Sequence, residues 1–97
     1  RARADAESAA FDALIMPTVA CVAPSIAEIE ASEELYAKMN PYILRNTTVG
    51  NLLDRCAMTL PCHKPGQAPA GFMVMGETGG DERMVRVSLA VETALNN

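Results

Sequence analysis

The amino-acid sequence predicts an α/β fold with about three short strands and flanking helices. Short apolar runs that end at Pro or Gly are typical of strands, and stretches with apolar residues at helical spacing are typical of helices. The two kinds alternate in the order helix, strand, helices, strand, strand, helix. Because the chain has 97 residues, we expect residues 1–97 to form a single unit with a modest core.

The N-terminal third is expected to hold one helix and one strand. Residues 1–10 are rich in Ala with interspersed charges, which favours a helix by propensity. The run Ala13-Leu14-Ile15-Met16 then resembles a strand that is buried on both faces of a sheet. We therefore expect a central strand that ends at Pro17.

The middle of the chain is expected to hold two helices separated at a proline. Ser25 and Glu28 have the spacing of a capping box, and Ser32 offers a second helix start. We expect a helix over about residues 32–40. Because the residue before a proline avoids helical geometry, Pro41 should interrupt this helix and begin a second one that runs to about residue 55.

The C-terminal part is expected to contain two strands and a closing helix. Residues 57–60 are predicted to form a strand that Pro61 stops, and residues 64–70 a loop with two prolines and a glycine. Residues 71–76 are predicted to form the third strand. Acidic Asp81 and Glu82 suit a helix start, and helical apolar spacing continues to about residue 96.

Charge and hydropathy exclude several classes of partner. The formal net charge is −4 with eight scattered basic residues, whereas nucleic acids and anionic membranes need clustered Lys and Arg. No apolar run approaches the length of a membrane span, and the N-terminus has no apolar segment typical of a secretory signal. We expect a cytoplasmic protein.

The chain starts at Arg1 rather than Met, within a stretch that already favours a helix, so we expect a piece of a longer protein.

The cysteines and the single histidine suggest one alternative chemistry. Three cysteines at unpaired spacings predict reduced, buried thiols rather than a disulfide framework or zinc hooks. Cys62 beside His63 would allow a thiol nucleophile, but neighbours in an extended segment usually point apart, which favours a small core residue at a strand end. With His63 as the only histidine, no zinc site with more than one histidine can form. We expect neither a metal nor a cofactor.

Three polar residues are candidates for substrate binding, namely Asn46, Asn51 and Asp54. Asp54 closes an apolar segment just before a strand, and its simpler interpretation is a carboxylate paired with Arg55 or Arg45. The two asparagines could instead be hydrogen-bonding groups of a helix or loop. No serine, lysine, cysteine or histidine has a setting typical of catalysis, so the chain shows no active site of its own.

Four segments in order resemble amidase-signature enzymes. FDALIMPT at 11–18 is similar to a strand-ending motif of that family, and NLLDRCAMTLPC at 51–62 is similar to a later Asn-containing segment. PAGFMVMG at 69–76 is similar to a Gly-bounded strand, and Gly79-Gly80-Asp81 precedes the closing helix as in the family. The chain departs from the pattern at Asp54, where Gly is frequent, and at Cys56, where Pro is common.

The resemblance implies the C-terminal part of a large α/β enzyme with a mixed central sheet. Such enzymes hydrolyse carboxamide C–N bonds through an acyl-enzyme, using a Ser–cis-Ser–Lys triad that lies upstream of this segment. No catalytic residue is therefore assigned here, and the segment would provide sheet strands and one wall of a pocket for a small amide substrate. Its partners would be the missing N-terminal part or a second copy. The alternative is a non-catalytic α/β interaction or dimerisation module.

Overall fold

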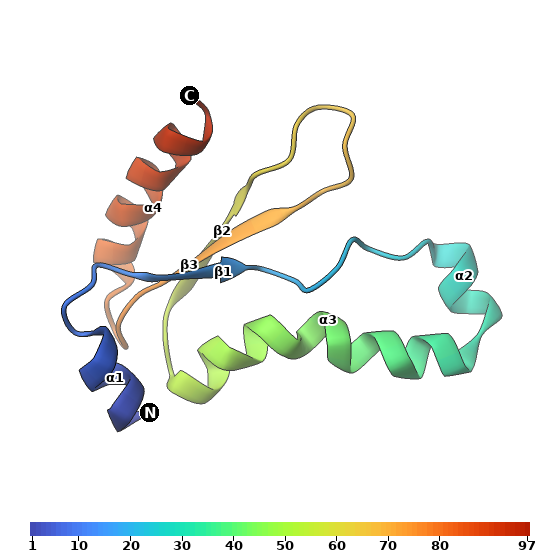
Figure 1. The fold of residues 1–97 in the computed structure, drawn as a ribbon, viewed down its shortest axis with the longest axis horizontal. Coiled ribbons are helices and arrows are strands. Elements are labelled where there is room, and N and C mark those ends of the chain that lie inside the picture. Colours follow the sequence, from blue (N-terminus) through green and yellow to red (C-terminus); the bar gives the residue numbers. More distant parts are fainter.

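A computed structural model describes the whole chain, Arg1–Asn97, and contains four helices and one three-stranded sheet (Figure 1). The elements are α1 (Ala2–Ser8), β1 (Leu14–Pro17), α2 (Ile26–Ala31), α3 (Glu33–Leu53), β2 (Ala57–Pro61), β3 (Gly71–Met75) and α4 (Asp81–Leu95). This order confirms the predicted α/β class and its three short strands. The predicted loop at 64–70 also lies outside any helix or strand.

The sheet has the order β1-β3-β2, and both pairs of neighbours are antiparallel. Ile15 and Met58 both pair with Val74, so β3 lies in the middle. The prediction of β1 as a central strand buried on both faces is therefore wrong for this chain. Nothing here pairs with the outer edge of β1, and Ile15 is 61% exposed. These three strands also show none of the parallel pairing that a mixed sheet contains.

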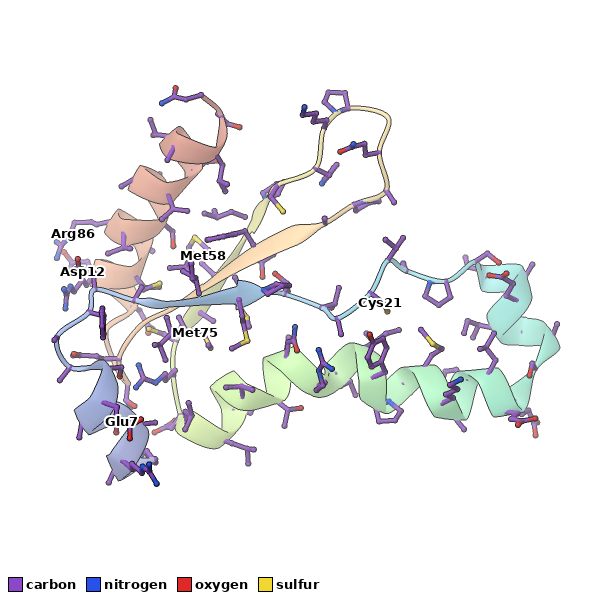
Figure 2. The ribbon with its side chains drawn as sticks, in the orientation of Figure 1. Glu7, Asp12, Cys21, Met58, Met75 and Arg86 are labelled. Atoms are coloured by element: carbon purple, nitrogen blue, oxygen red, sulfur yellow. The ribbon has the colours of Figure 1, made fainter.

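The two faces of the sheet pack against different helices. Val74 and Leu60 point towards α4 and form the buried core together with Met84. Met75 points to the opposite face, where its sulfur lies close to Gly50 of α3. Figure 2 shows this division, since Met58 lies on the α4 side of the sheet and Met75 on the α3 side.

Helix α4 covers β2 and β3 with one apolar stripe. Asp81 and Glu82 occupy its first turn, as predicted, where their charge suits the helix N-terminus. Met84 and Ser88, one turn apart, are buried against the sheet. Leu89 is exposed on the outer side, and α4 makes no comparable contact with β1.

Helix α3 corrects the predicted break at Asn40–Pro41. One helix runs through Pro41 to Leu53, instead of two helices over about 32–40 and 41–55. The proline removes one backbone hydrogen bond, but its exposed position leaves the ring in solvent. The helix ends at Leu53 because Asp54 adopts left-handed geometry with φ of 54°. Neither α3 nor any other helix combines the length and apolarity needed to cross a membrane.

The capping signals before α2 and α3 are confirmed. The Ser25 side chain accepts a hydrogen bond from the Glu28 N–H, and the Glu28 carboxylate accepts one from the Ser25 N–H, both at 3.2 Å. Ser32 caps α3 through the Leu35 N–H at 3.1 Å. Helix α2 is short and packs on the N-terminal half of α3. Together they extend away from the sheet (Figure 1).

Helix α1 is held by charge rather than by apolar burial, since none of its residues is buried. Its contacts are made by Arg55, whose side chain is only 3% exposed. Arg55 Nη2 donates to Asp5 Oδ1 at 2.9 Å and to Ser8 Oγ at 2.8 Å. The helix ends at Ser8, two residues before the predicted end, and the Ser8 hydroxyl donates to the Ala4 carbonyl.

Breaking the Asp5–Arg55 contact should destabilise the chain. In Asp5→Asn the buried guanidinium loses its counter-charge, and because Asp5 itself is partly exposed we expect a loss of about 1–3 kcal/mol. The exposed Arg3–Glu7 pair of the same helix, at 2.9 Å, provides the control, and Glu7→Gln should change stability by less than about 0.5 kcal/mol. Urea unfolding measures both values. Equal midpoints for the two variants would show that the Arg55 contact contributes nothing.

Gly71 allows a close approach of two threonines at the start of β3. A Cβ atom at Gly71 would lie 2.6 Å from Thr18 Oγ1 and 2.6 Å from Thr59 Cγ2. The two threonine hydroxyls are themselves hydrogen-bonded at 3.2 Å. Because β-branched side chains are stiff, neither threonine can easily move aside.

We expect Gly71→Ala to lower the free energy of unfolding by about 2 kcal/mol through overpacking. The control is Gly76→Ala, whose new methyl would meet the flexible end of Met84 at 2.8 Å and the Cys56 sulfur at 3.1 Å. It should cost less, because the end of Met84 can move aside and the Cys56 contact needs only a small shift. Urea midpoints compare the two variants. A larger loss in Gly76→Ala would contradict the role given to the two threonines.

Candidate functional site

The three predicted pocket residues do not meet in one cavity. Asn46 is half-buried on α3, and its Nδ2 donates to the Pro17 carbonyl at 2.8 Å. Asn51 is exposed, and no hydrogen bond from its side chain is found. Asp54 follows α3 and faces α1. All three lie outside the largest groove of the molecule.

Asp54 pairs with Arg1, which corrects the predicted partners Arg55 and Arg45. Its Oδ2 lies 2.9 Å from Arg1 Nη1, and its carbonyl accepts a hydrogen bond from the Thr78 hydroxyl. Arg55 points instead to Asp5, and Arg45 to Asn46. The left-handed backbone at Asp54 turns the carboxylate towards α1, away from the side chains of the helix that it ends.

Arg1 also lines a small polar cavity of about 180 Å³. Six polar side chains line it: Arg1, Asp5, Ser8, Arg55, Glu77 and Thr78. The Nε of Arg55 is buried there without a hydrogen-bond partner. Two arginines and two carboxylates line the cavity, and both arginines already bind carboxylates of this chain. The cavity therefore joins α1 to the body of the protein, and it offers no paired nucleophile and base.

The largest depression is an open groove of about 520 Å³, which we call the apolar groove. One wall is Val19–Val22, and the other is Cys62 together with Pro69–Phe72. Its floor includes Ile15 and Pro17 of β1. By the strand register these two side chains share a sheet face with Val74 and Phe72. This is the face that α4 leaves open over β1, and no charged side chain lines the groove.

The cysteines differ from the prediction in their surroundings. All three are free, but Cys21 and Cys56 are only half-buried and Cys62 is exposed. Cys62 is therefore not a core residue, and it lines the apolar groove together with Cys21. Figure 2 places Cys21 on the segment between β1 and α2. Sequence patterns missed this groove because small apolar residues from two distant segments form it.

Cys62 and His63 are not arranged as a nucleophile and its base. The Cys62 thiol donates to the Ala70 carbonyl at 3.5 Å. His63 Nδ1 accepts the Ala70 N–H at 3.2 Å, so the backbone occupies this ring nitrogen. The two side chains thus bond the carbonyl and the N–H of the same residue, Ala70. This geometry favours a structural role over a thiol enzyme.

The serines and lysines are also dispersed. Ser8 and Ser88 lie within helices, and Ser25 and Ser32 cap helices. No serine hydroxyl bonds a lysine anywhere in the chain. The structure thus pairs no serine or lysine with a second group as a nucleophile and its base.

Comparisons with known proteins place the chain beside enzymes that act on amides and amines. It is 33% identical over 85 residues to a 2-amino-5-chloromuconic acid deaminase of Comamonas testosteroni, a match that covers 87% of this chain and 18% of that protein. It is 31% identical over 84 residues to fatty acid amide hydrolases of two rice subspecies, Oryza sativa subsp. indica and subsp. japonica, covering 84% of this chain and 14% of theirs. No family model matches, and neither does any solved structure. The chain spans less than a fifth of the length of these relatives and is similar to a part of each.

Proposed function

We propose that this chain is the C-terminal segment of a longer amidase-signature enzyme that hydrolyses carboxamide C–N bonds. In that reaction a serine attacks the amide carbonyl, the amine leaves, and water then hydrolyses the acyl-enzyme. The four ordered motifs and the similarity to a deaminase and to fatty acid amide hydrolases over most of the chain support this assignment. The triad would be supplied by the preceding part of the enzyme. This chain would supply strands and a pocket wall and would be inactive alone.

The observation that carries the proposal is the apolar groove, which has the size and lining of a ligand site. Pockets for small molecules span about 300–1,000 Å³ and are mostly apolar with a few polar groups. We propose that the groove receives the apolar acyl part of the amide substrate. The rice relatives are named for fatty acid amides. A carboxylate substrate of the muconic type would need a facing cation, and the groove presents none.

The three polar candidates for substrate binding differ in whether their side chains are already bonded within the chain. Asn51 is exposed, with no side-chain hydrogen bond inside the chain, so its amide is free for a substrate or for another part of the enzyme. Asn46 and Asp54 are already engaged by Pro17 and Arg1. Of the three, we propose that Asn51 contacts the substrate directly.

We also propose that the enzyme is cytoplasmic, and the free cysteines agree with this location.

The surface of the chain supports a covering partner. It exposes 6932 Å², whereas a compact monomer of this mass exposes about 5,400 Å². Its radius of gyration is 15.5 Å, against about 12.5 Å for a compact domain of this length. Only eight residues are buried, and large apolar side chains such as Phe11 and Leu52 are exposed. We propose that the preceding part of the enzyme covers these surfaces and the free edge of β1.

A groove-filling substitution tests the acyl site in the longer enzyme. Ala70→Trp should narrow the groove and displace about two methylenes of a long acyl chain, which lowers kcat/KM for long-chain amides about fifteenfold at ~0.8 kcal/mol per methylene. Short-chain amides should be affected little. The matched control is Ala68→Trp, on the same exposed loop but outside the groove. Equal losses for short and long amides, or no amide hydrolysis by the longer protein, would contradict the proposal.

The isolated chain tests the proposed partner. In sedimentation, we expect its apparent mass to rise with concentration without reaching a defined oligomer. Its exposed apolar surface should associate with other copies non-specifically, because it is not shaped to bind a second copy in one way. Co-expression with the preceding part should suppress this association and restore amide hydrolysis. A discrete, saturable dimer would favour the interaction or dimerisation module. A compact monomer with a radius of gyration near the value for a single domain would contradict the need for any covering partner.

A further inference from the structure

Two side chains of α3 hold the segment that leaves β1. The Tyr42 hydroxyl donates to the Ala20 carbonyl at 3.3 Å, and Asn46 Nδ2 donates to the Pro17 carbonyl at 2.8 Å. Residues four apart lie on one face of a helix, so both donors point towards the same segment. Figure 1 shows this segment running alongside α3 on its way to α2.

Arg45 orients both donors. Its guanidinium carbon lies 5.3 Å from the centre of the Tyr42 ring, a cation–π distance. Its Nε donates to Asn46 Oδ1 at 3.2 Å. Because Oδ1 accepts from Arg45, the NH₂ group of the Asn46 amide faces the Pro17 carbonyl. We call Tyr42, Arg45 and Asn46 the α3 clamp.

The segment held by the α3 clamp is one wall of the apolar groove. Residues 18–25 contain no helix or strand, so their carbonyls depend on partners outside the segment. Ala20, which the clamp binds, lies within the wall Val19–Val22. The opposite wall belongs to β3 and the β2–β3 loop, which the clamp does not contact. The two walls meet at Thr18, whose N–H donates to the Gly71 carbonyl at 3.0 Å. Beyond this point no hydrogen bond joins Val19–Val22 to the opposite wall, so the distance between the walls there depends on the clamp.

We infer that Tyr42, Arg45 and Asn46 are positioning residues that set the width of the apolar groove and so select the acyl chain that it accepts. The selection of an acyl chain rests on the proposed function. The position of the Val19–Val22 wall does not rest on the proposed function, because it follows from contacts within this chain. Asn46 would then act on the substrate through the Pro17–Val22 backbone.

Alkylation of the three cysteines in the 97-residue chain, at concentrations where sedimentation shows a monomer, measures the wall directly. Cys21 lies on the clamped wall, Cys62 on the opposite wall, and Cys56 outside the groove, where its thiol donates to the Glu77 carbonyl at 3.1 Å. Mass spectrometry of peptides reports each alkylation rate separately. The test variants are Tyr42→Phe and Asn46→Asp, which each remove one donor. The matched controls are Tyr36→Phe and Asn40→Asp, on the exposed N-terminal half of the same helix.

We expect each test variant to raise the alkylation rate of Cys21 about fivefold, the change that the loss of one typical hydrogen bond makes to an opening equilibrium. Cys56 should keep its rate, and the controls should leave all three thiols unchanged. Rates for Cys21 that match those of the controls would overturn the inference. Parallel acceleration of all three thiols would also overturn it, because it would indicate general loosening rather than movement of one wall.

The longer enzyme tests the selection of acyl chains. Asn46→Asp and Tyr42→Phe should change the ratio of KM values for long-chain and short-chain amides about fivefold relative to Tyr36→Phe. If Cys21 were alkylated faster but the ratio of KM values stayed the same, the clamp would position the wall without selecting the acyl chain. If the longer protein hydrolysed no amide at all, the proposed function would fail while the alkylation result would still report on the clamp.

Discussion

Strand pairing on both edges of β3 joins the two ends of the chain. β1 comes from the first twenty residues, while β3 lies beyond residue 70, and their register aligns Leu14 with Met75. Val74 and Met75 are completely buried. Val74 packs in the α4-side core and Met75 against α3, so β3 links the two layers. The groove exists because this pairing brings Pro17 and its successors next to Gly71 and Phe72.

The sequence predicted local features well because their causes are local. The Ser25–Glu28 capping box, the acidic start of α4 and the Pro and Gly boundaries of the strands depend on a few neighbouring residues. Strand order depends on contacts across the whole chain, and the apolar composition of β1 could not reveal which edge it would occupy. The same composition would suit a central position once another strand covered its free edge.

The site was less predictable than the fold. Its polarity marked Asn46 as a side chain that needs a partner, but the sequence could not show that the partner is a carbonyl near the end of β1. The apolar groove was not predicted, although part of its lining lies in the motifs at 11–18 and 69–76, because those motifs do not show that the two segments meet. The role of Tyr42 could not be predicted either, because it depends on a hydrogen bond to Ala20, which lies far from it in sequence.

Pro41 shows how tertiary contacts outweigh a local break, and the outcome matters for the groove. The N-terminal half of α3 is fixed by the Ser32 cap and by α2, and the C-terminal half by the α3 clamp and by packing at Gly50. Both halves are therefore anchored separately, and the proline costs the helix one hydrogen bond rather than its continuity. Tyr42 and Asn46 both follow Pro41 and lie one turn apart, so the C-terminal half alone keeps the two donors in phase towards one strand exit. A break at Asn40 would leave the clamp on one helix, but it would free the direction of α2 relative to that helix. Residues 18–25, which have no secondary structure of their own, lead into α2, so the far end of the clamped wall would then lose its fixed attachment.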